Sequence, residues 1–326
     1  MAEVVTTSDG RKLAFPEVGD PDGPLVLHNH GGPSSRLEAH LLADAAATNG
    51  IRLICVDRPG MGASDPQKNR TYKGWADDLL AVADALGYQE FGVTGWSEGG
   101  PWALAAAAYI DPARLRHVSS ISPGSYGAFG DNSAAQHLSK IDALGGALAL
   151  HFKPEFRLMY ALLGLSAKRF RTSFVKQLIN KVTEYDRQIL LRPDVAEQFA
   201  DTCAECFAHG SAGLVEDAEL LYRRWAFDVG SIQRPIHLWQ GLDDALVPDP
   251  INKAVADATP ARSGIPSRGQ GISWPSVAAT KYWRSPPRSW ARREQVVAAV
   301  AGRPGDRLAD SGDRGDRARG QRAGPT

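Results

Sequence analysis

The residue that could do chemistry most directly is Ser97, in the segment GWSEGG at residues 95–100. Gly95 and Gly99 lie two residues before and after it, which is the G-x-S-x-G spacing of a nucleophile held on a sharp turn. Such a turn strains the backbone of the serine, and side chains two residues away on either side would collide. The apolar segment FGVTG precedes the serine and an alanine-rich segment follows it. We therefore predict that Ser97 is a nucleophile between a strand and a helix.

Two backbone N–H groups are expected to stabilise the negative oxygen that forms when such a serine attacks a carbonyl. The first belongs to Glu98, at the beginning of a helix whose free N–H groups point at the reacting oxygen. The second belongs to Gly32, in the glycine-rich turn of HNHGGP at residues 28–33. Each such donor typically contributes roughly 2.7–4 kcal/mol to the transition state. These residues are the predicted oxyanion hole.

Alternating strands and helices are expected to position these residues. Apolar strands separated by helical segments predict an α/β fold with a mostly parallel, doubly wound sheet. A long helical stretch interrupts this rhythm before the strands resume, which predicts a helical cap over the carboxyl edge of the sheet, where ligands bind in such folds. The expected organisation is a core at residues 1–123 and 231–260, a cap at 124–230 and a tail at 261–326.

Four motifs follow one another along the chain: HGGP at 30–33, DRPGMGASD at 57–65, GWSEGG at 95–100 and GLDDALVP at 241–248. The motifs and their order resemble those of the α/β-hydrolase superfamily. The resemblance covers about residues 10–260 and is strongest to the capped branch of serine esterases, lactonases and proline iminopeptidases. It implies that an aspartate orients a catalytic histidine. By the family's G-x-x-D-x-x-V-P motif this aspartate is Asp244 rather than its neighbour Asp243.

The resemblance also implies a histidine roughly 25–30 residues after Asp244, and the sequence has none there. His28 and His30 flank the predicted oxyanion loop and could approach Ser97, but structural packing is the favoured interpretation for both. No histidine occupies the family's position, so the catalytic base is unassigned. The eight histidines are His28, His30, His40, His117, His137, His151, His209 and His237.

The composition changes at about residue 261. Residues 261–326 contain one leucine, no phenylalanine and 12 arginines. Such a segment buries too little apolar surface to offset its ordering entropy, so a disordered tail is predicted. One hypothesis is an out-of-frame translation, since residues 271–274 (GISW) can be encoded as GGC ATT TCC TGG. Reading that from its third base gives CAT TTC CTG, which encodes His-Phe-Leu where the family has its histidine.

Composition and charge exclude several classes of protein. Residues 1–260 carry a net charge of −8, which argues against nucleic acid as a partner, and residues 261–326 carry +8. The sequence has no apolar run long enough to span a membrane and no signal-peptide pattern at its start. Three cysteines form no disulfide framework, which favours the cytoplasm. The CAEC pair lacks further zinc ligands, so neither a metal nor a cofactor is expected.

These observations predict a serine hydrolase that cleaves an ester, lactone or amide of a small molecule by acyl transfer through Ser97. Its activity is expected to be impaired, because a serine without a base is a weak nucleophile. The alternative is a non-catalytic protein that keeps a hydrolase-like pocket for ligand binding. A basic tail that binds nucleic acid is disfavoured, because its arginines alternate with aspartates and glycines. The substrate and the oligomeric state are left open.

Overall fold

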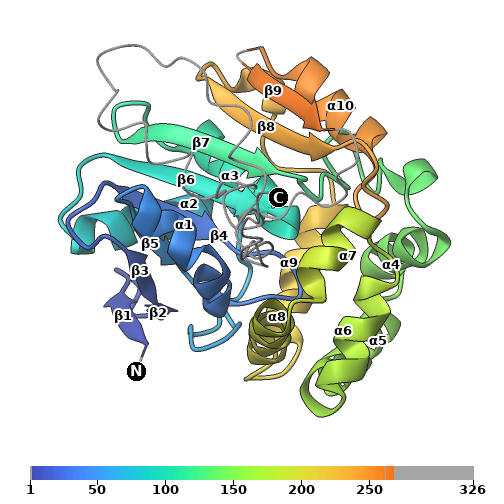
Figure 1. Cartoon of the computed structure of the whole chain (residues 1–326). Coiled ribbons are helices and arrows are strands. Elements are labelled where there is room, and N and C mark those ends of the chain that lie inside the picture. Colours follow the sequence, from blue (N-terminus) through green and yellow to red (C-terminus); the bar gives the residue numbers. More distant parts are fainter. Residues whose placement is uncertain (1, 261, 268–326) are drawn as a thin grey trace, which may run out of the picture.

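The structure is a computed structural model that describes residues 2–260 and 262–267. Its centre is a seven-stranded sheet in the order β3-β5-β4-β6-β7-β8-β9 (Figure 1). Only β3 runs antiparallel to its neighbour, β5, and the other adjacent strands in this sheet are parallel. The strands are β3 (Glu17–Gly19), β4 (Leu25–Asn29), β5 (Arg52–Cys55), β6 (Phe91–Trp96), β7 (Leu115–Ile121), β8 (Ile236–Gly241) and β9 (Arg262–Ser267). A separate antiparallel pair consists of β1 (Glu3–Thr6) and β2 (Lys12–Phe15).

Strand β4 shows why the sheet is covered on both faces. Its side chains alternate in direction, as in any strand, and all five of its residues are buried. Leu25 and Leu27 pack into a cluster with α2 (Tyr72–Ala85) and α3 (Gly100–Tyr109). Val26, between them, packs into a second cluster with α1 (Ala43–Thr48). A continuous apolar strand therefore occupies the middle layer between helices, as the sequence predicts.

Six α-helices lie between β7 and β8, where the sequence analysis expects the cap. Trp96 and Ile121, the last residues of β6 and β7, share a buried cluster with Val175, Leu190 and Cys203 from three of these helices. The helices therefore pack against the carboxyl edge of the sheet, as Figure 1 also shows. They are α4 (Lys140–His151), α5 (Lys153–Arg169), α6 (Arg171–Ile179), α7 (Glu184–Leu190), α8 (Pro193–Cys206) and α9 (Ala212–Tyr222). The predicted α/β fold with a helical insertion is confirmed.

The end of the core differs from the expectation. Helix α10 (Asp249–Ala258) is followed by β9, which pairs in parallel with β8 from Ile236 to Gly241. The sheet thus continues beyond residue 261, where the sequence analysis began the tail. The change in composition was a poor guide to this boundary, because backbone pairing to a neighbouring strand requires no leucine or phenylalanine. The tail expected for residues 268–326 lies outside the described residues.

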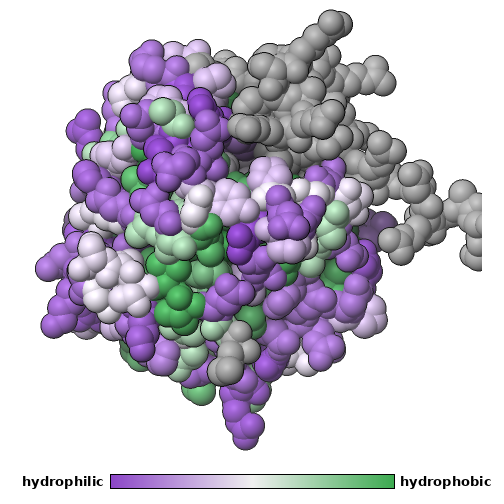
Figure 2. Space-filling view, turned by 90° about the vertical axis from the view of Figure 1, so that its left-hand side faces the viewer, coloured by the Kyte–Doolittle hydropathy of each residue, from purple (hydrophilic) through white to green (hydrophobic). Residues whose placement is uncertain are grey.

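The hydropathy of the surface is consistent with apolar side chains being buried in the interior. Figure 2 shows that the left-hand side of Figure 1 is mainly hydrophilic, with a smaller apolar area near its middle. Among the described residues, no helix has both the length and the apolar character needed to cross a membrane.

Candidate active site

The turn around Ser97 is a tight strand-to-helix connection. Ser97 directly follows β6, and its φ of +53° lies in the left-handed region that residues other than glycine rarely adopt. A Cβ atom at Gly95 would lie 2.1 Å from the carbonyl oxygen of Gly99, and one at Gly99 would lie 2.0 Å from that of Asn29. Only glycine fits at either position. The backbone strain at Ser97 is therefore maintained by close approach of main chain on both sides.

The register of the sheet brings the predicted site residues to one edge. Asn29 of β4 pairs with Gly95 of β6, so Gly32 follows one strand as Ser97 follows the next. Ile121 of β7 pairs with both Trp96 and Trp239, which brings the end of β8 to the same edge. The N–H of Gly124 donates to the carbonyl oxygen of Ser97 at 2.9 Å and closes the turn.

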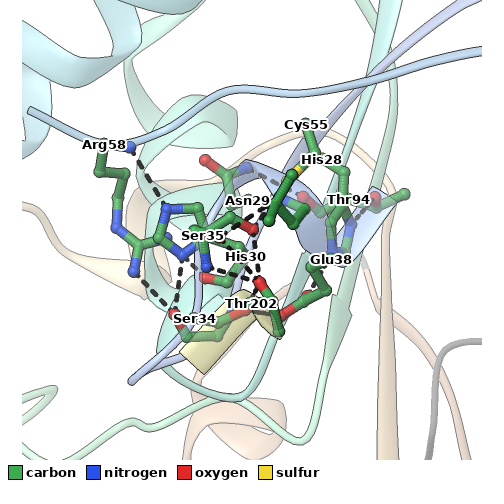
Figure 3. Close-up of polar contacts among 12 residues, drawn as sticks. His28, Asn29, His30, Ser34, Ser35, Glu38, Cys55, Arg58, Thr94 and Thr202 are labelled. Carbon is green, nitrogen blue, oxygen red and sulfur yellow. Dashed lines mark hydrogen bonds and ion pairs between the residues drawn. The ribbon is translucent and has the colours of Figure 1, made fainter. Parts of the chain in front are cut away.

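The loop after β4 is held by charged side chains. The Gly31 N–H donates to Glu38 Oε2 at 3.0 Å. The Arg58 guanidinium donates to the carbonyl oxygens of His30 at 2.5 Å and Gly31 at 3.1 Å (Figure 3). Because the Gly31 N–H already has an acceptor, Gly32 is the better candidate for the oxyanion donor of this loop. A Cβ atom at Gly32 would lie 1.8 Å from Glu98 Oε2, so the two predicted donor residues are in contact.

Arg58 is itself fixed by the cap. Its Nε donates to Asp217 of α9, and Arg70 pairs with the other oxygen of the same carboxylate. The Arg58 and Asp217 side chains are fully buried. Sequence reasoning missed this network, although Arg58 lies in a motif that it used. A charged residue next to a buried strand was a usable signal, since a buried arginine needs a partner.

His28 and His30 are both engaged in packing and hydrogen bonds. The ring nitrogens of His28 contact Glu38 Oε1 and Thr94 Oγ1, each at 2.7 Å. Those of His30 contact the Gly31 carbonyl oxygen at 2.9 Å and the Arg58 N–H at 3.3 Å. Burial lowers the pKa of His30 well below its usual value. Neither ring has a nitrogen left for Ser97, which agrees with the structural interpretation.

His237 is also unsuited to act as the base. It lies within β8, paired with Ser119, and its ring stacks on that of His117 at 4.7 Å between centroids. Burial lowers its pKa to about 4. The four remaining histidines are exposed: His40, His137, His151 and His209. The structure therefore assigns the role of base to none of the eight, and the expected position near residue 272 lies outside the described residues.

Asp244 has the geometry of an orienting carboxylate. Its Oδ1 accepts the N–H groups of Leu246 and Val247, each at 2.9 Å. Its Oδ2 is buried and completes no hydrogen bond of normal geometry within the described residues. Burial raises the pKa of Asp244 to about 6, while the two N–H groups and the nearby Ser122 hydroxyl oppose that rise. One oxygen is fixed by the backbone and the other is available to a further donor.

The side chain of Glu98 is a part of the site that sequence reasoning missed, since it used only the N–H of this residue. Glu98 Oε2 is buried without a hydrogen-bond partner among the described residues. Burial raises the pKa of Glu98 to about 7, and the charge of Arg58 opposes this rise. The signal in the sequence was a charged residue inside a turn whose other positions are apolar or small.

The model of the protein family described as 'alpha/beta hydrolase fold' matches residues 24–268, which is most of the chain. The chain belongs to the α/β hydrolase family. This confirms the resemblance drawn from the four motifs. The matched region ends after β9, so the part of the chain that matches the family extends beyond residue 261.

The curated proteins that this chain resembles have several different activities. It is 32% identical over 123 residues to a non-heme chloroperoxidase of Streptomyces lividans, covering 36% of this chain and 45% of the relative. It is 33% identical over 106 residues to epoxide hydrolase B of Mycobacterium tuberculosis, covering 32% of this chain and 30% of the relative. A proline iminopeptidase of Lacticaseibacillus rhamnosus is 33% identical over 113 residues, covering 33% and 38%. The matches thus span less than half the length of each of these relatives.

Solved structures share the fold over a larger part of this chain than the curated relatives match. An alpha/beta hydrolase fold protein from Nakamurella multipartita superposes with a TM-score of 0.60 at 22% identity, covering 92% of this chain and 99% of that one. The enol-lactonase from Burkholderia xenovorans LB400 gives a TM-score of 0.60 at 15% identity, covering 83% and 93%. At these identities the likeness concerns the fold.

Proposed function

We propose that this α/β hydrolase cleaves an ester, lactone or amide of a small molecule by acyl transfer through Ser97. The observation that carries the proposal is the left-handed backbone of Ser97 at the carboxyl edge of the sheet, enforced by Gly95 and Gly99. A hydroxyl held in such a turn faces the helix start that follows it, beside the loop of Gly32. The proline iminopeptidase among the relatives supports this reaction class.

In the proposed reaction, Ser97 Oγ bonds to the carbonyl carbon and loses its proton to a base. The N–H groups of Gly32 and Glu98 stabilise the resulting oxyanion. The bond to the leaving alcohol or amine then breaks, and this group takes the proton. Water hydrolyses the acyl-enzyme by the same steps and restores the serine hydroxyl. None of these steps requires a metal or a redox cofactor.

Asp244 would orient the base by accepting its N–H at Oδ2. The sequence holds no histidine after His237, so the protein with this sequence lacks the family's base. Removing one member of such a catalytic unit commonly lowers kcat on the order of 10⁶-fold. We therefore expect slow turnover from this chain, arising from the oxyanion hole and substrate binding alone.

Fluorophosphonate labelling tests the proposal. The chain is compared with one in which the alternative reading frame follows residue 261 and supplies a histidine, and with Ser97→Ala variants of both. We expect fast labelling and ester hydrolysis in the restored chain, both abolished by Ser97→Ala. A folded restored chain with no labelling at Ser97 would contradict the serine mechanism. Sequencing the locus tests the frame hypothesis separately, since finding no compensating insertion or deletion near codon 261 removes it.

A further inference from the structure

The carboxylate of Glu98 is a buried acceptor next to the proposed nucleophile. Glu98 follows Ser97 in the chain, and its carboxylate packs against Gly32. Any group that binds to this carboxylate therefore lies beside the carbonyl that Ser97 attacks. Its Oε2 has no hydrogen-bond partner within the described chain, and a buried acceptor left without a donor carries a cost in free energy. A ligand that supplies N–H donors would remove this cost.

The Glu98 carboxylate has no ion-pair partner among the described residues. Burial is the largest cause that raises its pKa, the charge of Arg58 opposes this rise, and Asp217 and Asp142 add smaller rises. The Arg58 side chain already donates to Asp217 and to two loop carbonyls. Within the described residues, neither Glu98 nor Asp244 forms an ion pair. The Glu98 carboxylate, once ionised, is therefore paired directly with no cation of the described residues.

Tyrosine rings lie close to the same turn. The Tyr126 N–H donates to the carbonyl oxygen of Gly124, whose own N–H donates to the Ser97 carbonyl oxygen. Tyr126, Tyr160 and Tyr222 belong to one buried cluster. The rings of Tyr126 and Tyr222 stack at 5.1 Å, and Tyr160 contacts Phe156 at 4.7 Å between centroids. Aromatic faces attract ammonium groups, and more strongly where water is excluded. A carboxylate beside several tyrosines is a combination suited to an organic cation.

We propose that Glu98 and the neighbouring tyrosines form a recognition site for a positively charged amino group of the substrate. The inference rests on the proposed function, because it assigns a substrate class to the same site. Recognition is linked to chemistry, since an ionised carboxylate beside the oxyanion hole opposes the developing negative charge. A bound ammonium group neutralises that carboxylate. Cationic substrates are therefore favoured over neutral ones of the same shape, and anionic substrates are disfavoured.

The test compares two probes of similar shape, benzylammonium and benzyl alcohol, by equilibrium titration followed through tryptophan fluorescence at pH 8. The proteins are the chain with its given sequence, the Glu98→Gln variant and the Glu3→Gln variant. Glu3 is an exposed residue of β1 and serves as the matched control. We expect benzylammonium to bind the unmodified chain and Glu3→Gln at least about tenfold more tightly than benzyl alcohol. In Glu98→Gln the two probes should bind within about twofold of one another, with benzyl alcohol unaffected.

Equal binding of the two probes to the unmodified chain, or an unchanged ratio in Glu98→Gln, would overturn the proposal. Glu98→Gln should fold, because Oε2 has no hydrogen bond to lose, and circular dichroism verifies this. Binding requires no reaction, so the result is independent of the missing base. Selective binding without fluorophosphonate labelling of the restored chain would retain the amine site and reject the serine mechanism. Fluorophosphonate labelling of Ser97 without selective binding of benzylammonium would retain the serine mechanism and reject the amine site.

Discussion

Glu98 and Gly32 are in contact across the proposed oxyanion hole, with Glu98 Oε2 where a side chain at residue 32 would begin. Both residues offer an N–H to the same oxygen in the proposed reaction, yet only one has a side chain. The absence of a Cβ at Gly32 creates the space that the carboxylate occupies. Together the two residues would form the proposed oxyanion hole and one wall of the proposed substrate site.

Alanine at Gly32 should displace this carboxylate with little effect on the fold. The clashing atoms belong to the end of a flexible side chain, so we expect a loss of at most about 1 kcal/mol in the free energy of unfolding. Alanine at Gly99 would instead meet the backbone oxygens of Asn29 and His30, at 2.0 and 2.6 Å. It should cost about 3 kcal/mol or more. Urea denaturation of both variants measures the difference, and equal losses would contradict it.

Glu98→Gln should make the protein more stable above neutral pH. Burial raises the pKa of Glu98 from 4.5 to about 7, so the folded state holds this proton more tightly than the unfolded state. The resulting stability is fully present below pH 4.5 and is lost as the pH rises through about 7. By pH 8 this loss should reach about 2–3 kcal/mol, and Gln avoids it.

Urea denaturation of Glu98→Gln and the unmodified chain at pH 4.5, 6 and 8 measures this effect. Asp244, whose pKa burial raises to about 6, titrates in the same direction in both proteins, so their difference isolates Glu98. A constant difference across this range would show that Glu98 is not the titrating group.

Asp217→Asn should destabilise the protein strongly, because it leaves two buried arginines with less compensation. Asp217 accepts from both Arg58 and Arg70, and all three side chains are at most 3% exposed. Removing one partner of such a buried network typically costs 3–5 kcal/mol, here measured by urea denaturation. The control is Asp257→Asn, which breaks an exposed pair with Lys253 and should cost under about 0.5 kcal/mol. Similar losses for the two variants would show that the buried network adds no stability.

Local geometry can be predicted from the sequence where the interacting residues are neighbours along the chain. The turn at Ser97 follows from glycines two residues away, and the two N–H donors to Asp244 come from two and three residues beyond it. The sequence was insufficient where partners come from distant segments. Arg58 and Asp217 are 159 residues apart, and no local pattern pairs them.

The environment of a side chain was equally hard to predict. The Glu98 carboxylate packs against Gly32, which belongs to a loop far earlier in the chain. Thr202 of α8 likewise contacts the hydroxyls of Ser34 and Ser35, which are more than 160 residues earlier (Figure 3). Such contacts arise only once the cap has folded onto the sheet. The expected end of the core also differs from the structure, in which β9 pairs with β8 beyond residue 261.

Free imidazole should partly replace the missing base in the chain with its given sequence. Asp244 Oδ2 is an acceptor without a partner of normal geometry within the described residues, and a neutral imidazole can donate one N–H there while its other nitrogen takes the serine proton. A positioned base contributes roughly 10²–10⁴-fold, so we expect imidazole to accelerate hydrolysis of an activated ester at least about tenfold. The acceleration should increase from pH 6 to 8, as imidazole becomes neutral and Asp244, with its pKa raised by burial to about 6, ionises. Assays of Ser97→Ala measure the direct reaction of imidazole with the ester, and this rate is subtracted. Asp244→Asn should abolish most of the imidazole-dependent acceleration that is left. An acceleration of the same size in Ser97→Ala would show that the serine takes no part.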